Sequence, residues 1–349
     1  MRGSLSSSSL NSQEGKLKRK PIALIKETRQ KYFVKKIMDT IADRIELSSA
    51  KRVAIKINLS GPKEIYANTH YETVEDLIFY LKDKFNIQDI SVVEGSDGAY
   101  FSGRTTWDIF YKFRYKEVEL NGAKLVNLDD LQHNNKLSVK TIYGDKEIFY
   151  TKIDTDYMIS VVPPKTFNIF PVFLSIPNLI GFVRPEDRAF MYGVSFPDLK
   201  KLNSLPEDKY LKAIIYAGKN FVNLLKNIRP SLVLIDGLYG MEGKGPVKGS
   251  PVFHGFSVAS EDPLLVDSLT TYLMGFEVND VPYIYFGFRE GLGNNRWQNV
   301  IGVDPPQVKF PYRPHPLFQK MKKWKDFYQK NKNLFNGYSS NNNRENKRF

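Results

Sequence analysis

The chain of 349 residues contains no cysteine. This absence excludes disulfide bonds, thiolate catalysis and cysteine-ligated zinc or iron–sulfur sites within the chain. The sequence also lacks an apolar run near the roughly 20 residues that span a bilayer, and its N-terminus lacks the apolar segment of a secretory signal. We therefore expect a cytoplasmic protein with no membrane partner.

Histidine is scarce as well, and its spacing is uninformative. The four histidines show neither the HxH nor the HExxH pattern, which argues against a zinc hydrolase. They stand at His70, His133, His254 and His315. Only His254 lies near the glycine-rich segment discussed below, so we take it as a candidate ligand-binding residue, with a packing role as the alternative.

Negative charge is depleted at both ends of the chain. Residues 1–20 contribute +4 and residues 313–349 contribute +8 to the net charge of +13, which leaves +1 for residues 21–312. We expect disordered basic tails at 1–20 and 336–349, and the apolar spacing at 313–335 predicts an amphipathic basic helix. Nucleic-acid binding through these termini is one hypothesis, and simple solubilisation is the other.

Between these ends, strand-like and helix-like patterns alternate in a domain over residues 21–312. The order strand, helix, strand predicts βαβ units, hence an open, mostly parallel sheet with flanking helices in an α/β fold. A change to short alternating stretches at 124–153 predicts a small β-hairpin insertion. The expected strands are 21–26, 52–58, 89–96, 156–165 and 231–237, and the expected helices are 31–47, 73–85, 205–228, 261–276 and 281–293.

Polar residues follow four of the expected strands. In an open parallel sheet, ligands bind beyond the carboxyl ends of the strands, so these residues are expected to face one crevice. The alternative is that polar residues follow strands because loops are solvated. The residues concerned are Lys56, Asn58, Glu94, Ser96, Asp97, Lys165 and Asp236.

The segment "LIDGLYGMEGKGPVKGSP", residues 234–251, is unusually rich in glycine. Several positions with φ > 0 in compact turns would explain this, as would backbone amides that approach an anionic ligand, supplemented by Lys244 and Lys248. The segment matches neither the dinucleotide fingerprint nor the phosphate loop of nucleotide hydrolases. We take Gly240, Gly243 and Gly245 as candidate ligand-binding positions.

Three carboxylates near this segment form a candidate metal site. Asp236, Glu242 and Asp262 offer the oxygen ligands that Mg²⁺ or another divalent cation prefers. Asp236 and Glu242 are also candidate catalytic acid and base groups, together with Lys165. For Asp262 the alternative is a role at a helix N-terminus beside Pro263.

The ordered motifs "VAIKINL", "NTHYETVEDLI", "VVEGSDG", "VVPPK", "NLIGF" and residues 234–251 resemble the family called domain of unknown function 362. The likeness covers roughly residues 50–303. It implies site roles for Lys165, Asn178, Asp236, Glu242 and Gly243, and it implies an association with iron–sulfur modules that this cysteine-free chain does not support. The sequence departs from the family pattern in "PPKTFNIF", which has no histidine, and in the proline before Asn178.

Three functions follow from these observations. The first is an enzyme or ligand-binding protein for a small anionic metabolite, with or without a divalent cation. The second is a nucleic-acid-associated protein that uses its basic termini, and the third is an accessory protein to an iron–sulfur electron-transfer partner. The 24 Phe and 20 Tyr also allow a homodimer face.

Overall fold

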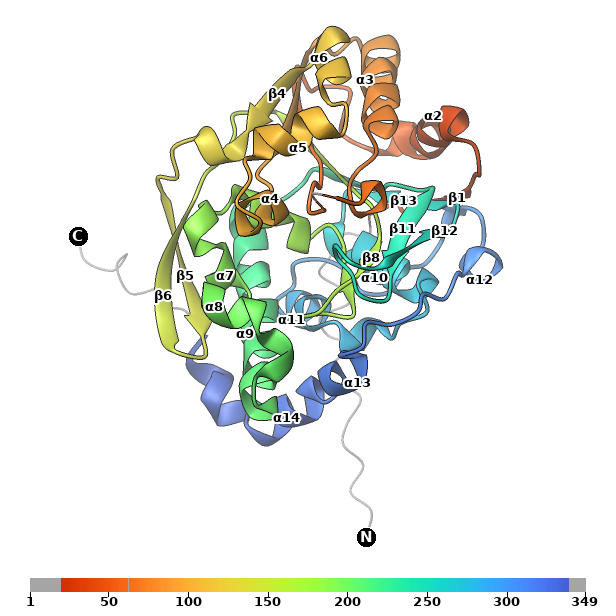
Figure 1. Cartoon of the computed structure of the whole chain (residues 1–349). Coiled ribbons are helices and arrows are strands. Elements are labelled where there is room, and N and C mark those ends of the chain that lie inside the picture. Colours follow the sequence, from red (N-terminus) through yellow and green to blue (C-terminus); the bar gives the residue numbers. More distant parts are fainter. Residues whose placement is uncertain (1–19, 62, 339–349) are drawn as a thin grey trace, which may run out of the picture.

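The computed structural model describes residues 20–61 and 63–338, with an eight-stranded sheet at its centre (Figure 1). The strand order is β14-β1-β13-β10-β7-β2-β3-β4. All strands run parallel except β13, which pairs antiparallel with both β1 and β10. The predicted open, mostly parallel sheet is therefore confirmed. The strands are β1 (Ala23–Lys26), β2 (Arg52–Lys56), β3 (Asp89–Glu94), β4 (Lys124–Asn127), β7 (Tyr157–Val162), β10 (Leu232–Ile235), β13 (Phe256–Ser260) and β14 (Ile301–Gly302).

Successive side chains of these strands point to opposite faces of the sheet and pack into two apolar cores, one on each face. Val53 and Ile55 lie in a core with helices α2 and α3, whereas Ala54 lies in the opposite core with α9, α10 and α11. Because helices cover both faces, the central strands β7 and β10 are buried along their whole length. The longer helices are α2 (Gln30–Ile41), α3 (Tyr71–Phe85), α9 (Glu207–Asn227), α10 (Pro263–Leu273) and α11 (Pro282–Arg289).

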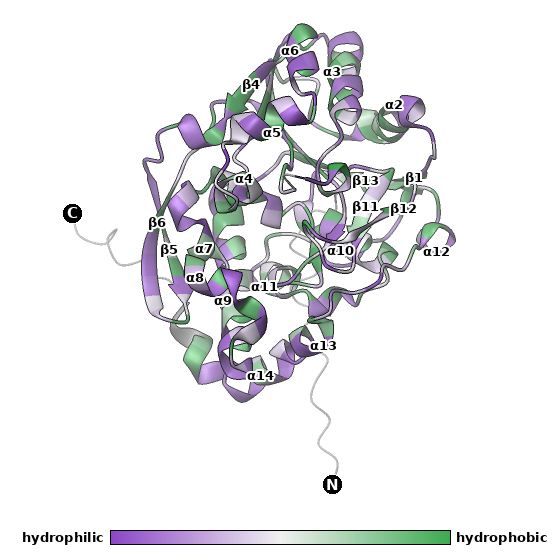
Figure 2. Cartoon of the chain, viewed as in Figure 1, coloured by the Kyte–Doolittle hydropathy of each residue, from purple (hydrophilic) through white to green (hydrophobic). Residues whose placement is uncertain are grey.

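Several helix boundaries differ from the sequence prediction, among them the ends of α10 and α11, which stop at Leu273 and Arg289 rather than at 276 and 293. Helix α2 ends at Ile41 and continues only as a 3-10 turn (Ala42–Arg44), so the expected extent to residue 47 was too long. Helix α3 begins at Tyr71 rather than at Thr73, and Asn86 ends it in a left-handed conformation. In Figure 2, hydrophilic and hydrophobic residues alternate along α2 and α3. The hydrophobic residues of both helices lie in the core against the sheet.

Shorter helices connect the strands. Thr105 caps one of them through a reciprocal capping box with Asp108, which explains why that helix begins there. The α-helices are α4 (Asp97–Phe101), α5 (Thr106–Lys112), α6 (Lys116–Leu120), α7 (Arg188–Met191), α8 (Phe196–Lys200), α12 (Pro305–Val308), α13 (Phe318–Met321) and α14 (Trp324–Lys330).

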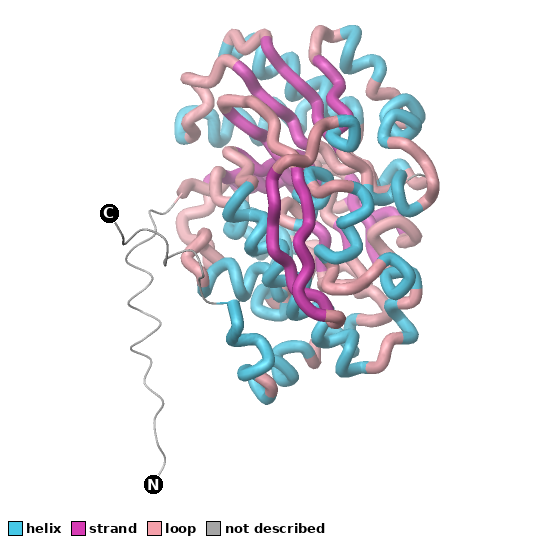
Figure 3. The backbone as a smooth tube through the Cα atoms, turned by 90° about the vertical axis from the view of Figure 1, so that its left-hand side faces the viewer, coloured by secondary structure: helices cyan, strands magenta, loops and turns pink. Residues whose placement is uncertain are grey.

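Two smaller sheets complete the fold. Strands β5 (Asn135–Thr141) and β6 (Gly144–Tyr150) form a separate hairpin that packs on α7 and α9, and Figure 3 shows it as a long paired ribbon. Strand β4 belongs to the main sheet, so the inserted hairpin is narrower than the predicted 124–153. The other sheet has the order β12-β11-β8-β9 and consists of β8 (Lys165–Thr166), β9 (Val172–Phe173), β11 (Tyr239–Glu242) and β12 (Ser250–Phe253).

The basic C-terminal segment is docked on the body but is not one helix. Helices α13 and α14 and a 3-10 turn (Lys332–Tyr338) replace the continuous helix expected at 313–335. Trp324 is buried against Tyr285 and Phe286, and its Nε1 donates to the Asp280 carbonyl at 2.8 Å. The remaining predicted tail residues, 1–19 and 339–349, lie outside the described residues. Within the described part, no helix has the length and apolar character needed to cross a membrane.

Candidate functional site

The order in which the parallel strands are added to the sheet reverses at β2. From β2 the chain moves outward to β3 and β4, then returns to place β7 on the other side of β2, with β10 beyond it. Such a switch point leaves a crevice at the carboxyl ends of the strands. Lys56 and Glu94 are the last residues of β2 and β3, so both reach this crevice.

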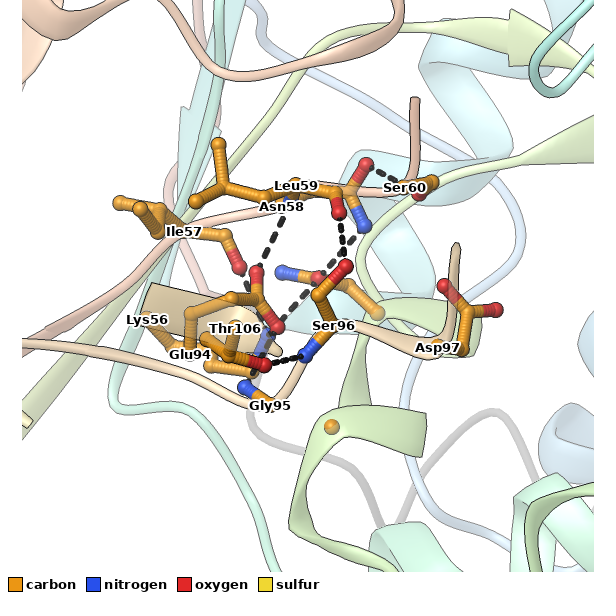
Figure 4. A network of polar contacts seen from close by, with 12 residues as sticks. Lys56, Ile57, Asn58, Leu59, Ser60, Glu94, Gly95, Ser96, Asp97 and Thr106 are labelled. Carbon is orange, nitrogen blue, oxygen red and sulfur yellow. Dashed lines mark hydrogen bonds and ion pairs between the residues drawn. The ribbon is translucent and has the colours of Figure 1, made fainter. Parts of the chain in front are cut away.

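A buried ion pair forms the centre of the site (Figure 4). Lys56 Nζ lies 3.0 Å from Glu94 Oε1 and also donates to Asn178 Oδ1 at 3.0 Å and to the Ile57 carbonyl at 2.6 Å. Glu94 accepts further bonds from the backbone N–H groups of Leu59 at 2.9 Å and Gly95 at 2.8 Å. Each charged group therefore has a full set of partners, which a buried ion pair requires.

Asn58 joins this pair to a second buried lysine. Its Nδ2 donates to Asn178 Oδ1 at 3.0 Å, and its Oδ1 accepts a bond from Lys165 Nζ. Lys165 Nζ also lies 2.9 Å from Ser60 Oγ and 2.8 Å from the Ala67 carbonyl. The structure thus brings together five of the predicted residues in one continuous network: Lys56, Asn58, Glu94, Lys165 and Asn178.

Burial shifts the titration of all three charged groups. Desolvation lowers the pKa of Lys56 and raises the pKa of Glu94, while their mutual attraction opposes both shifts. Lys165 has no carboxylate in contact, and burial lowers its pKa to about 7. Lys165 is therefore the group of this network suited to exchange a proton near neutral pH. The mutual attraction of Lys56 and Glu94 favours the charged form of each group.

A pocket of about 440 Å³ adjoins the network. Ser60 is a lining residue of this pocket, and its Oγ contacts Lys165 Nζ, so this residue connects the pocket with the buried lysine. Most of the remaining surface is apolar, and two lysines, Lys63 and Lys248, stand at the exposed rim. The other lining residues are Asp97, Gly98, Phe101, Ser102, Phe167, Asn168, Tyr192, Leu199, Pro246 and Val247.

The first turn of α4 forms one wall of this pocket. Ser96 caps the helix by accepting a bond from the Ala99 N–H at 2.9 Å, and its hydroxyl donates to the Leu59 carbonyl. Asp97 accepts a bond from Tyr192 Oη at 3.1 Å. A Cβ at Gly98 would lie 1.7 Å from the Ser60 carbonyl oxygen, so only glycine permits this approach. Ser96 therefore has a structural role in the site, and Asp97 presents a carboxylate to the pocket.

The three carboxylates of the predicted metal site do not meet. Asp236 accepts bonds from the His70 N–H and the Thr73 hydroxyl, both at 2.9 Å, and so caps the start of α3. Glu242 accepts the Arg313 N–H at 2.7 Å and thereby holds the C-terminal segment. Asp262 caps α10 by accepting bonds from the Leu264 and Leu265 N–H groups.

Register explains why Asp236 and Asp262 are separated. Asp236 follows the carboxyl end of β10, whereas Asp262 follows β13, which runs antiparallel and ends beside the start of β10. The two carboxylates therefore lie at opposite edges of the sheet. Within the described ranges, no group of three or more His, Asp or Glu side chains is arranged to hold a metal ion. Binding of a divalent cation therefore stays a prediction, and these three carboxylates do not together form a site for it.

The glycine-rich segment forms the β11–β12 hairpin instead of a simple loop. Close packing explains two of the predicted positions, because a Cβ at Gly240 would meet Tyr312 and a Cβ at Gly245 would meet Thr166. Gly243 has a φ of 74°, which favours glycine. The hairpin tip nevertheless contributes residues 246–248 to the pocket, while Lys244 is exposed and is not among its lining residues.

His254 is fully buried beside Phe256, with ring centroids 4.1 Å apart. Its Nδ1 accepts the Phe256 N–H at 3.2 Å, and burial lowers its pKa to about 3. This environment matches the packing alternative. Sequence reasoning also missed Ser60, Tyr192 and Phe101, of which only Ser60 carried a signal, since it closely follows β2.

Comparisons with known proteins found a distant relative, two solved structures of low similarity and one family model. Thylakoid-associated protein sll1697 of Synechocystis sp. is 24% identical over 190 residues, covering 54% of this chain and 51% of that protein. The chain thus spans about half the length of this relative. Lactate racemase apoprotein from Thermoanaerobacterium thermosaccharolyticum superposes with a TM-score of 0.37 at 13% identity, covering 61% of this chain and 50% of that one.

A protein from Thermotoga maritima superposes with a TM-score of 0.42 at 11% identity, covering 73% of this chain and 58% of that one. Residues 53–272 match the family model described as domain of unknown function (DUF362). That range includes the buried network, the pocket residues and the β11–β12 hairpin. Because the match spans more than half of the 349 residues, the chain belongs to the DUF362 family.

Proposed function

We propose that the pocket above β2 and β7 binds a small anionic metabolite that also carries an apolar portion. The main support for this proposal is the position of Ser60, which lines the pocket and contacts Lys165. This arrangement joins a solvent-reachable cavity to a titratable group inside the protein. Functional sites often combine an apolar pocket with a few polar groups and a titratable group whose pKa is shifted.

The rim of the pocket favours an anion. Lys63 and Lys248 are exposed, and neither forms an ion pair with a residue in the described part of the chain. Their positive charge is therefore available to a carboxylate or phosphate group. Phe101, Phe167 and Leu199 would cover an apolar portion of the same ligand. Asp97 adds an acceptor for a ligand hydroxyl or amine.

The interior supports proton transfer. In the structure Lys165 Nζ donates to Ser60 Oγ, and the Ser60 hydroxyl donates to Asn58 Oδ1 at 2.8 Å. With Lys165 in its neutral form, the Ser60 hydroxyl turns from Asn58 to Nζ and passes its proton there while Ser60 Oγ accepts a proton from the ligand. The ligand then loses one proton and Lys165 gains one, so the step is balanced. A base whose pKa lies near the working pH is well suited to this exchange. Lys165 is thus proposed as the base and Ser60 as the relay, which retains the catalytic role first assigned to Lys165.

Titration calorimetry with phenylacetate and phenyl phosphate tests the binding proposal, because each probe joins a ring to an anion. Lys248→Gln and Lys63→Gln are expected to weaken binding about 3- to 10-fold, as expected for loss of a charge-assisted contact. Lys244→Gln is the matched control, because Lys244 is on the same hairpin but outside the pocket. Equal affinity in all three variants would contradict an anion at this rim.

Native mass spectrometry of the purified full chain tests whether a ligand or divalent metal is retained. A bound mass that is lost in Phe101→Ala and kept in Lys244→Gln would assign the ligand to the pocket. A metal lost only after chelation, with the pocket ligand unaffected, would restore the cation hypothesis at another position. Nucleic-acid binding through the basic termini stays an alternative prediction, because residues 1–19 and 339–349 lie outside the described structure.

A further inference from the structure

A second pocket, of about 790 Å³, shares no lining residue with the first. Its lining residues come from the end of α10, the turn that follows it, α11, α14 and the segments around residues 295–297 and 309. Figure 1 shows α11 and α14 in the lower half of the molecule. The volume is within the range of small-molecule sites. Its wall consists of Tyr272, Gly275, Phe276, Glu277, Val278, Asn279, Tyr285, Phe288, Arg289, Asn295, Arg296, Trp297, Lys309, Lys325 and Gln329.

Aromatic rings form a continuous part of this wall. The ring centroids of Tyr272 and Trp297 lie 5.1 Å apart, and both residues are partly exposed. Tyr285 and Phe288 belong to the adjoining wall on α11. Partly exposed rings in a hollow offer flat apolar surfaces on which another planar ring can stack.

Basic side chains lie over these rings. Lys309 Nζ is 4.3 Å from the Tyr272 ring centroid, and the Arg289 guanidinium carbon is 4.9 Å from that of Tyr285. Lys325 Nζ approaches the same Tyr285 ring at 5.5 Å. The pocket wall contains four basic residues and one acid, Glu277, so it carries a net positive charge. Rings beside fixed cations suit a ligand with a planar ring and an anionic group.

Asn295 supplies a third, independent feature. The residue is 8% exposed, and its buried Oδ1 has no hydrogen-bond partner among the described residues. The same residue borders an adjoining cavity of about 160 Å³, so Asn295 stands between two hollows. An enclosed acceptor without a partner is unfavourable, and a ligand N–H group at this position would satisfy it.

We propose that this aromatic–basic pocket binds a nucleoside phosphate. The base stacks against Trp297 and Tyr272, Asn295 Oδ1 accepts an N–H of the base, and the phosphate meets Lys309, Arg289 and Lys325. The same chemistry is offered by a free nucleotide and by one unit of a single-stranded nucleic acid. Lys325 on α14 lines this pocket, so the basic C-terminal segment contributes directly to the proposed binding of the phosphate.

Isothermal titration calorimetry of the full chain with adenosine 5′-monophosphate and a ten-residue oligoadenylate tests the proposal. Trp297→Leu is expected to weaken binding roughly 10-fold through loss of stacking. Lys309→Gln and Lys325→Gln are expected to weaken binding about 3- to 10-fold while the melting temperature stays near wild type, because both changes are at the pocket surface. Lys330→Gln is the matched control, since Lys330 is on α14 but outside the pocket.

The two probes distinguish the source of the ligand. Equal affinity for monophosphate and oligoadenylate, with both weakened to the same extent in Lys309→Gln, assigns a free nucleotide. Tighter oligoadenylate binding, with log affinity falling about 0.7 per phosphate contact against log salt, assigns a single strand. Absence of binding by either probe at millimolar concentration, or binding that Trp297→Leu and Lys309→Gln leave unchanged, overturns the proposal. Because the first pocket shares none of these residues, its variants report separately on the small-anion proposal.

Discussion

Replacement of Lys165 by methionine is the sharpest test of the buried network. Methionine nearly fills the lysine volume but removes the titratable amine, which is fully buried and has no carboxylate in contact. Loss of its bonds to Asn58, Ser60 and Ala67 will destabilise the variant by a roughly constant amount. The informative quantity is therefore the pH dependence of the difference in unfolding free energy between wild type and variant.

The sign of that dependence follows from the lowered pKa of Lys165, about 7 in the folded chain against an ordinary 10.5. Between these values the unfolded chain binds a proton that the folded chain lacks, so wild-type stability rises with pH. The slope approaches about 1.4 kcal/mol per pH unit, which amounts to about 3 kcal/mol between pH 7 and 9.5. Below pH 7 both states are protonated and the difference is flat.

Urea unfolding at several pH values measures this difference, and the titration of a ¹³C-labelled lysine ε-carbon reports the ionisation directly. Lys244→Met, at an exposed lysine, is the control and is expected to leave the pH profile unchanged. A Lys165→Met profile parallel to wild type from pH 7 to 9.5 would refute the reasoning. In that case Lys165 would remain an ammonium ion, and the proposed proton relay through Ser60 would have no base.

Three further predictions concern the surroundings of that lysine. Glu94→Gln should lower the unfolding free energy by about 3–5 kcal/mol, because it leaves Lys56 charged and buried, and Lys56→Met in the same chain should recover part of this loss in denaturant titrations. Asp236→Asn should cost about 1–2 kcal/mol and increase hydrogen exchange in the first turn of α3 while ligand binding persists, since Asp236 caps that helix. Gly98→Ala should weaken binding of phenyl phosphate in calorimetry, because its Cβ would displace the Ser60 backbone.

Sequence patterns located much of the site because parallel strands bring their carboxyl ends to one edge. Lys56, Asn58, Glu94 and Lys165 could be grouped on this basis before any coordinates. The same argument also placed Asp236 in this group. Asp236 follows a strand as well, but its side chain contacts the start of α3 instead. A strand end therefore predicts the edge of the sheet at which a residue lies, but not the group that its side chain contacts.

The metal prediction depended on distance along the chain, which does not report distance in space. Glu242 and Asp262 lie near Asp236 in sequence, yet β13 runs antiparallel and carries Asp262 to the far edge. The glycine-rich segment was similarly ambiguous, because glycine permits both amide–ligand contact and close packing. Neighbours such as Tyr312 and Thr166 come from remote parts of the chain, so packing at Gly240 and Gly245 became visible only in the fold.

The sequence by itself determined the alternation of strands and helices, the parallel sheet, the family and the identity of the polar residues at the strand ends, because apolar periodicity and local motifs are properties of short segments. The tertiary structure alone decided which side chains share a cavity and which are enclosed. Ser60 meets Lys165, and Tyr272 meets Trp297 and Lys309, through contacts between separate segments. Desolvation then sets the pKa of Lys165, and this effect depends on every residue that covers the amine.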